Sequence, residues 1–310
     1  MALNARGHLW TIAPRLRHAV RPIPCPEARP WETVVEDPRI GPVRLSGLLR
    51  EAPGADELVV LVHGLGGSTE SHYMPRGAAA EAAGLSCLRL NLRGSDRTGE
   101  DYYHAGLTAD LHAALASPDL RRYRHLYVLG YSMGGHVSLR LATEPADPRL
   151  AAVATLCAPV DLARSQREID TPALWLYRRY LLANLGTLYV AVAARRPVPF
   201  PVERLGEIGT FRDWDDRIVA PRYGFTGAAD YYARASVAPH LGALRVPALL
   251  LNSEHDPMVP ARSVRPALTG AFPLLTVTWL RGGGHVSFPR RMGIDAQALA
   301  WLRSQTSRKA

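Results

Sequence analysis

The chain has 310 residues, of which 47% are apolar and 21% are charged. This length and balance are typical of one large α/β domain with an insertion, or of two modest domains with sizeable cores. The net charge of +9 comes from scattered arginine, because Lys309 is the sole lysine. With no basic cluster in the sequence, we expect no nucleic-acid binding surface.

Three cysteines, Cys25, Cys87 and Cys157, are far apart in the sequence and show no metal-ligand spacing. Two of them lie in apolar runs, where a free thiol behaves as a small hydrophobic group. We therefore expect no metal and a reducing, cytoplasmic location. The N-terminus lacks the apolar region of a secretory signal, and the longest apolar stretch, 180–194, is short for a membrane span.

Residues 1–40 are rich in proline and arginine without a sustained period, so we expect an irregular N-terminal arm. Over 41–310, continuous apolar runs alternate with alanine-rich segments. Such runs suit strands that are buried on both faces of a mostly parallel sheet. The predicted strands are 42–49, 58–62, 85–92, 126–129, 153–157, 248–252 and 275–280, and the predicted helices are 77–83, 107–116, 133–143 and 293–304. This alternation predicts an α/β fold with helices on both faces of the sheet.

The alternation is interrupted at about 162–240, after the strand predicted at 153–157. Here apolar side chains recur at three- and four-residue steps, as in one stripe of an amphipathic helix or a broken pair of helices: Leu174, Tyr177, Leu181, Leu185, Leu188 and Val192. We interpret the insertion as a helical cap over the site, with Leu181 and Leu185 contacting substrate. A plain extra helical layer and peripheral contact with a lipid surface are the alternatives.

The pattern G-x-S-x-G at 130–134 lies directly between a predicted strand and a predicted helix. In this context it indicates a nucleophile elbow, a sharp turn that exposes the serine. The glycines let the backbone fold back without clashes, and the following helix directs free N–H groups at developing negative charge. Ser132 is therefore the predicted nucleophile.

A glycine-rich turn, HGLGG at 63–67, follows the strand predicted at 58–62. Acyl transfer needs two N–H donors to the oxyanion of the tetrahedral intermediate. One normally belongs to the residue after the nucleophile, here Met133, and one to this turn, for which we predict Leu65. His63 is expected to hold the turn rather than to react.

Two later strand ends supply an acid and a base. Asp256 follows one strand and precedes a proline, so it is the predicted acid, with Glu254 and Asp110 as weaker candidates. His285 lies on a glycine-rich loop after the last predicted strand, from which it can accept the serine proton. The order Ser132, Asp256, His285 is the one expected for this architecture.

With these motifs in place, the chain resembles the α/β-hydrolase superfamily and, within it, the YheT-like branch of carboxylesterases. The resemblance covers nearly the whole chain and includes HGLGGSTESHY at 63–73, NLRG at 91–94 and DWDDRIVAPRYGFTGAADYY at 213–232. It implies a Ser–Asp–His hydrolase that acts on esters, sometimes lipid esters, without a cofactor. The nucleophile motif of that branch usually has Phe, Leu and Asn where this chain has Tyr131, Met133 and His136.

We therefore expect hydrolysis of a small-molecule carboxylic ester, with a short to medium acyl chain or a lipid ester, through an acyl-serine intermediate. A thioesterase or acyltransferase with the same triad is the alternative among enzymes. A non-catalytic binding module with a hydrolase fold is the alternative outside them. The sequence leaves the physiological substrate and the oligomeric state open.

Overall fold

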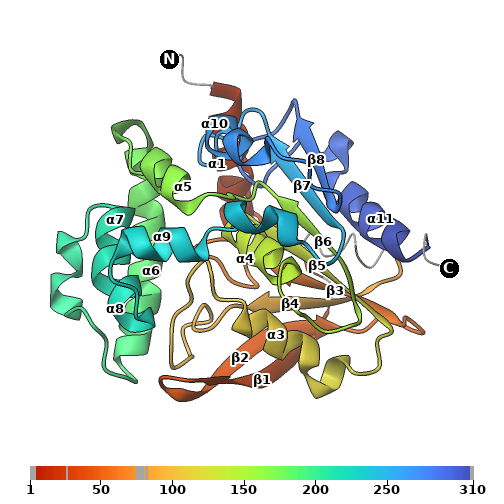
Figure 1. Ribbon diagram of the computed structural model, residues 1–310, viewed down its shortest axis with the longest axis horizontal. Helices are drawn as coiled ribbons and strands as arrows, with labels where there is room; N and C mark the ends of the chain where they lie inside the picture. Colours follow the sequence, from red (N-terminus) through yellow and green to blue (C-terminus); the bar gives the residue numbers. More distant parts are fainter. Residues whose placement is uncertain (1–4, 26, 75–79, 81–82, 308–310) are drawn as a thin grey trace.

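The computed structural model describes residues 5–25, 27–74, 80 and 83–307 (Figure 1). These residues form one eight-stranded sheet in the order β1-β2-β4-β3-β5-β6-β7-β8. Strand β2 is antiparallel to both of its neighbours, β1 and β4, and all other neighbours are parallel. The strands are Arg29–Asp37 (β1), Gly41–Arg50 (β2), Glu57–Val62 (β3), Ser86–Asn91 (β4), His125–Tyr131 (β5), Leu150–Leu156 (β6), Ala248–Ser253 (β7) and Leu275–Leu280 (β8). The predicted mostly parallel sheet is confirmed.

The central strands are buried on both faces because helices cover both faces of the sheet. In β5, Leu126 and Val128 belong to one apolar cluster, whereas Tyr127 and Leu129 belong to a second. The first cluster contains the apolar residues of α4 and the second those of α11. Among the described residues outside the insertion, the α-helices with assigned bounds are Ala5–Val20 (α1), Ala109–Ala116 (α3), Met133–Ala142 (α4), Ala261–Val264 (α10) and Ile294–Ser307 (α11). The helix predicted at 77–83 falls mostly outside the described residues.

The expectation of an irregular arm over residues 1–40 is wrong. Residues Ala5–Val20 form helix α1, and Arg29–Asp37 form an edge strand that pairs with β2 along its whole length. Most of the large apolar side chains of α1 are exposed, and its buried residues are Gly7 and Thr11, so its pattern does not resemble that of a core helix. Strand β1 buries only Trp31, Val35 and Asp37. Contacts with distant residues, rather than local pattern, stabilise both elements.

The insertion between β6 and β7 folds into a group of helices. Figure 1 shows them gathered to one side of the sheet. They are Leu162–Ile169 (α5), Trp175–Ala193 (α6), Phe211–Trp214 (α7), Ala220–Tyr223 (α8) and Ala228–Ala235 (α9), with a π-helical turn at Asp215–Val219. Among the described residues, no helix combines the length and apolarity needed to cross a bilayer.

A buried ionic cluster fastens this helical group to the sheet. The fully buried guanidinium of Arg93, which follows β4, lies 2.7 Å from Asp37, 2.9 Å from Asp101 and 2.7 Å from Asp110. Arg222 of α8 donates to Asp101 over 2.8 Å. A buried charge is tolerated only when it is paired and hydrogen-bonded, so losing one partner of this cluster is strongly destabilising. The cluster therefore holds α8 against the end of β1 and the loop that follows β4.

Candidate active site

Ser132 lies at the turn between β5 and α4 in a backbone conformation that L-residues rarely adopt. Its φ is +53° and its ψ is −122°. Such strain persists only where the surroundings impose it. A Cβ at Gly130 would lie 2.5 Å from the carbonyl oxygen of Gly134, and one at Gly134 would lie 2.3 Å from that of His63. Glycine is therefore required on both sides of the serine, and the turn presents Ser132 at the carboxyl edge of the sheet.

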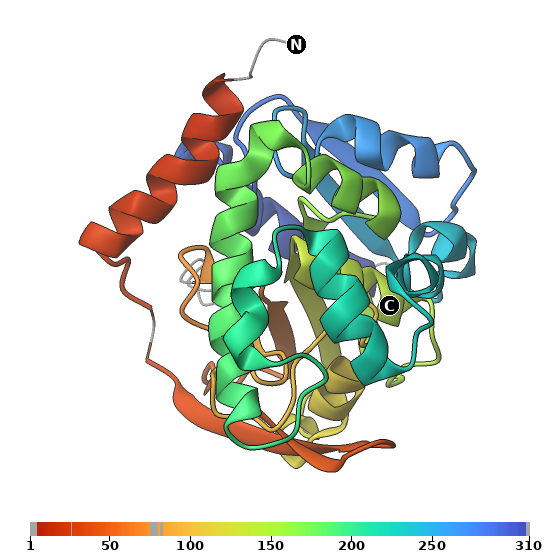
Figure 2. The same ribbon diagram turned by 90° about the vertical axis from the view of Figure 1, so that its left-hand side faces the viewer.

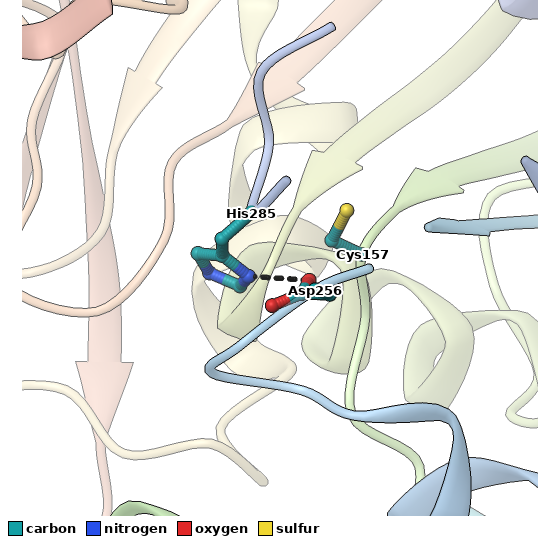
Figure 3. Close-up of side chains that lie close together, drawn as sticks. All are labelled: Cys157, Asp256 and His285. Atoms are coloured by element: carbon teal, nitrogen blue, oxygen red, sulfur yellow. Dashed lines mark hydrogen bonds and ion pairs between the residues drawn. The ribbon is translucent and has the colours of Figure 1, made fainter. Parts of the chain in front are cut away.

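The structure brings the three predicted triad residues into one hydrogen-bonded chain. The Oγ of Ser132 lies 2.9 Å from Nε2 of His285, and Nδ1 of His285 lies 2.7 Å from Oδ2 of Asp256. Figure 3 shows the His285 ring turned toward the Asp256 carboxylate. The other carboxylate oxygen accepts the backbone N–H groups of Met258, over 2.8 Å, and Val259, over 2.9 Å. An imidazole between a hydroxyl and a fixed carboxylate is the arrangement needed to take up the hydroxyl proton.

The two weaker acid candidates have other partners. Glu254 is exposed and lies 2.8 Å from Arg265. Asp110 is buried and accepts from Nε of Arg93 over 2.9 Å. Of the three carboxylates, Asp256 is the one that the fold brings to His285.

The predicted oxyanion donors are the backbone amides of Leu65, in the glycine-rich turn at 63–67, and of Met133, directly after Ser132. The Gly64 N–H donates to the Tyr73 hydroxyl over 2.8 Å, and the Gly66 N–H donates to the Tyr103 hydroxyl over 2.7 Å. The backbone N–H groups of Leu65 and Met133 donate to no group within the described part of the chain. Both residues line the same cavity as Ser132. These two amides can therefore donate to a ligand oxygen beside the serine.

His63 holds the turn in place, as expected. Its ring is buried, and Nδ1 lies 2.8 Å from the carbonyl oxygen of Gly64. With Nδ1 donating, Nε2 accepts the Leu92 N–H over 3.1 Å and the Ser95 hydroxyl over 3.0 Å. Burial lowers the pKa of His63 to about 4. The ring is therefore neutral near pH 7 and fully engaged in the loop structure.

Helix α1 supports both loops that carry the acid and the base. The Thr11 hydroxyl accepts the backbone N–H of His285 over 2.9 Å and donates to the Gly7 carbonyl over 2.8 Å. A Cβ at Gly7 would lie 1.8 Å from the carbonyl oxygen of His255, next to the acid. Sequence reasoning missed Thr11, because no local pattern links it to a residue 274 positions later.

A cavity of about 420 Å³ opens from the serine into the space between the sheet edge, α1 and the insertion. Leu181 and Leu185, the predicted substrate contacts, line it together with Leu188. Leu174 and Val192, from the same sequence stripe, are buried elsewhere. A concave, mainly apolar cavity with a few polar groups is typical of a small-molecule site.

One acidic group interrupts the apolar wall of the insertion. Asp215, in the π-helical turn, lines the cavity and accepts the Tyr232 hydroxyl over 2.6 Å. Burial, followed by the nearby charges of Asp170 and Asp216, raises the pKa of Asp215 to about 7. Below pH 7 the cavity therefore carries little negative charge at this point.

Cys157 lies beside the acid and the base (Figure 3), and ligand atoms of the three lie within 4.8 Å of one another. Burial and the Asp256 carboxylate raise the pKa of the Cys157 thiol well above its usual value. The sulfur lies 3.5 Å from the carbonyl of Gly284 and accepts the Val286 N–H over 3.4 Å. A metal requires the thiolate. The cluster is thus better suited to proton transfer, and the expectation of no metal stays a prediction.

Comparisons with known proteins agree with this architecture. The family model described as alpha/beta hydrolase fold matches residues 57–290. The chain is 28% identical over 269 residues to "Putative esterase YheT" of Escherichia coli (strain K12), covering 81% of this chain and 78% of that protein. It is 31% identical over 234 residues to the medium-chain fatty acid ethyl ester synthase/esterase 2 of Saccharomyces cerevisiae, covering 65% of this chain and 51% of that one.

Solved structures share the fold at low sequence identity. An esterase from Pyrococcus furiosus is 15% identical with a TM-score of 0.57, and the match covers 90% of each chain. The alpha/beta hydrolase GrgF from Penicillium is 15% identical with a TM-score of 0.59, covering 90% of this chain and 99% of that one. Because the family model spans most of the sequence, the chain belongs to the α/β-hydrolase family, and within that family it is YheT-like.

Proposed function

We propose that this protein is a serine hydrolase that cleaves carboxylic esters through an acyl-serine intermediate. The observation that carries the proposal is the hydrogen-bonded chain from Asp256 through His285 to Ser132, which ends at an apolar cavity. The names of the similar proteins, an esterase and an ester synthase/esterase, support ester chemistry at the general level.

The proposed first step joins substrate and enzyme. As Oγ of Ser132 attacks the ester carbonyl carbon, Nε2 of His285 accepts the hydroxyl proton. Asp256 holds Nδ1–H and stabilises the imidazolium. The carbonyl oxygen becomes an oxyanion that accepts the N–H groups of Leu65 and Met133, a contribution worth about 10²–10³ in kcat for each donor.

The remaining steps of the proposed reaction release the alcohol and then the acid, and so restore the free enzyme. When the tetrahedral intermediate collapses, the oxyanion re-forms the carbonyl, the bond from carbon to the alkoxy oxygen of the leaving group breaks, and Nε2–H of His285 gives its proton to that oxygen, so that the alcohol leaves. Water then gives a proton to Nε2 and attacks the acyl carbon. The bond to Oγ of Ser132 breaks, Oγ regains the proton, and the free acid leaves.

The insertion at about 162–240 acts in this proposal as a cap that forms the acyl pocket. Three leucines of α6, Leu181, Leu185 and Leu188, line the cavity that Ser132 also lines. Each methylene of an acyl chain buried there gains about 0.8 kcal/mol, or roughly fourfold in kcat/KM, until the pocket is full. We infer substrates with short to medium acyl chains, or lipid esters.

The variant Leu185→Trp should shift the preferred acyl chain to a shorter length. Its larger ring fills part of the pocket, so long chains lose burial while acetate esters keep their turnover. The measurement is kcat/KM across p-nitrophenyl esters of graded chain length. Val190→Trp is the matched control, because Val190 lies on the same helix but is exposed and outside the cavity wall.

A lowered melting temperature of Leu185→Trp with an unchanged chain-length profile would contradict the acyl pocket. In that case α6 would be only a packing layer on the sheet.

Acyl transfer to an alcohol is the second candidate, favoured by the yeast relative, which is named as both an ester synthase and an esterase. It differs in one step, because an alcohol rather than water attacks the acyl-serine. Measuring free acid and new ester in water containing ethanol separates the two reactions. Predominant formation of new ester would replace hydrolysis as the main activity.

A further inference from the structure

Exposed large apolar side chains are concentrated on one surface of the molecule. Within the described part of the chain, eleven large hydrophobic side chains are exposed, and eight of them lie in residues 9–23 and 175–180. The eight are Leu9, Ile12, Leu16, Val20, Ile23, Trp175, Leu176 and Tyr180. Their exposed fractions reach 89% at Val20. Clustered exposure of this kind marks an interaction site.

The two segments form one continuous surface, which we call the α1–α6 surface. His8 and Tyr177 are joined by a hydrogen bond of 2.8 Å, and their rings stack. The Arg15 guanidinium lies 3.6 Å from the centre of the Tyr180 ring. Figure 2 shows α1 beside the N-terminal part of α6. The exposed side chains of α1 recur at three- and four-residue steps, so they follow one face of that helix.

Positive charge surrounds these apolar groups. Exposed arginines lie at Arg6, Arg15, Arg17, Arg21 and Arg179. Residues 5–25 and 175–180 contain no aspartate or glutamate. Two copies of this chain meeting through the surface would bring like charges together. An anionic lipid headgroup layer would instead attract the arginines while the apolar side chains, with a tryptophan and a tyrosine, enter the layer.

The same surface borders the opening of the cavity. Ile12, Arg15 and Leu16 of α1, and Tyr177 and Tyr180 of α6, line both the surface and the cavity wall. An ester lying in the lipid layer would therefore reach Ser132 without first crossing water.

We propose that the α1–α6 surface binds an anionic phospholipid surface, and that the ester enters the cavity from that surface. The entry of an ester rests on the proposed hydrolase function, whereas lipid binding does not. Helix α1 belongs to both the lipid-binding surface and the active site, because the Thr11 hydroxyl on its buried face accepts the backbone N–H of His285.

The binding test uses the Ser132→Ala protein, so that catalysis does not alter the vesicles. Co-sedimentation is measured with vesicles of phosphatidylcholine alone and of phosphatidylcholine mixed with phosphatidylglycerol. We expect binding to the mixed vesicles, little binding to the neutral ones, and weakening as salt screens the charges. Each arginine near an anionic surface contributes about fivefold in affinity, so R6Q/R17Q/R21Q should bind on the order of a hundredfold more weakly.

The apolar part of the surface is tested by L9Q/V20Q/L176Q, which changes residues outside the cavity wall. We expect at least a tenfold loss of vesicle binding, because three apolar side chains no longer enter the lipid. Matched controls are R121Q/R124Q/R245Q and V34Q/L274Q, which alter exposed residues away from the surface. These controls should bind as the parent protein does.

Measurements of ester turnover then test whether lipid binding delivers the substrate. With Ser132 present, the two surface variants should keep wild-type turnover on a water-soluble ester and lose turnover on an ester carried in mixed vesicles. Unchanged melting temperatures show that they fold.

Three results would overturn lipid binding: no sedimentation with mixed vesicles at low salt, equal binding by surface and control variants, or a lipid-free dimer that the surface variants abolish. If Ser132→Ala binds vesicles while the wild type cleaves no ester, the proposed hydrolase function fails and lipid binding stands.

Discussion

Replacing Ser132 by alanine should lower kcat for ester hydrolysis by about a millionfold, the loss seen when the nucleophile of a comparable triad is removed. Without Oγ no acyl-serine forms, and His285 has no hydroxyl to deprotonate. The fold should persist, because alanine removes one hydroxyl that faces the cavity. The measurement is steady-state hydrolysis of a short p-nitrophenyl ester together with the melting temperature.

Ser138→Ala is the control for this experiment. Ser138 belongs to α4, the helix that follows Ser132, and its hydroxyl donates to the Gly134 carbonyl over 2.7 Å rather than to His285. It should keep most of the activity. If Ser132→Ala retained more than about one hundredth of wild-type turnover, in protein free of other hydrolases, Ser132 would not be the nucleophile.

The variant Asp256→Asn should lower kcat by roughly 10⁴, since an uncharged acid partner favours the wrong imidazole tautomer. Asp256 receives Nδ1–H of His285 on one oxygen and two backbone N–H groups on the other. An amide can offer its NH2 group to Nδ1 instead, which leaves the proton on Nε2, where the serine proton must go. The test compares kcat of this variant with that of Glu254→Gln.

Glu254→Gln is expected to have a small effect. Glu254 is exposed and pairs with Arg265, and such surface pairs contribute little. A large loss for Glu254→Gln beside a small loss for Asp256→Asn would show that the acid has been misassigned.

The three candidate triad positions were predictable because each follows a strand whose signal is local. Strands β5 and β7 each contain a continuous apolar run, 126–129 and 248–251, and the carboxyl ends of parallel strands meet at one edge of the sheet. Ser132 and Asp256 therefore had to come near one another. His285 was harder to place, since β8 is only partly buried, and its glycine-rich loop was the main indication.

The N-terminal contribution was not predictable from local pattern. Helix α1 buries a glycine and a threonine, and it turns its apolar stripe outward, so its period does not resemble that of a core helix. Its place depends on contacts with His285, His255 and Tyr177, which lie far along the sequence. Contacts between residues this far apart produce no local pattern that can be recognised in a single sequence.

The candidate oxyanion donors and the cavity wall were predictable in part. The glycine-rich turn indicated where a donor would lie, but only the structure shows that the hydroxyls of Tyr73 and Tyr103 occupy the amides on either side of Leu65. The apolar period of α6 likewise did not separate cavity residues from packing residues. Leu181 faces the cavity, whereas Val192, on the same stripe, does not.

The most direct measurement of the central claim is the site of reaction with a fluorophosphonate, which modifies an activated serine. After digestion and mass spectrometry, we predict one adduct, on the peptide containing Ser132. The adduct should be absent from Ser132→Ala, should form much more slowly in Asp256→Asn, and should form normally in Glu254→Gln. An unmodified Ser132, or an adduct that persists in Ser132→Ala, would contradict the assignment of Ser132 as a nucleophile activated by His285 and Asp256.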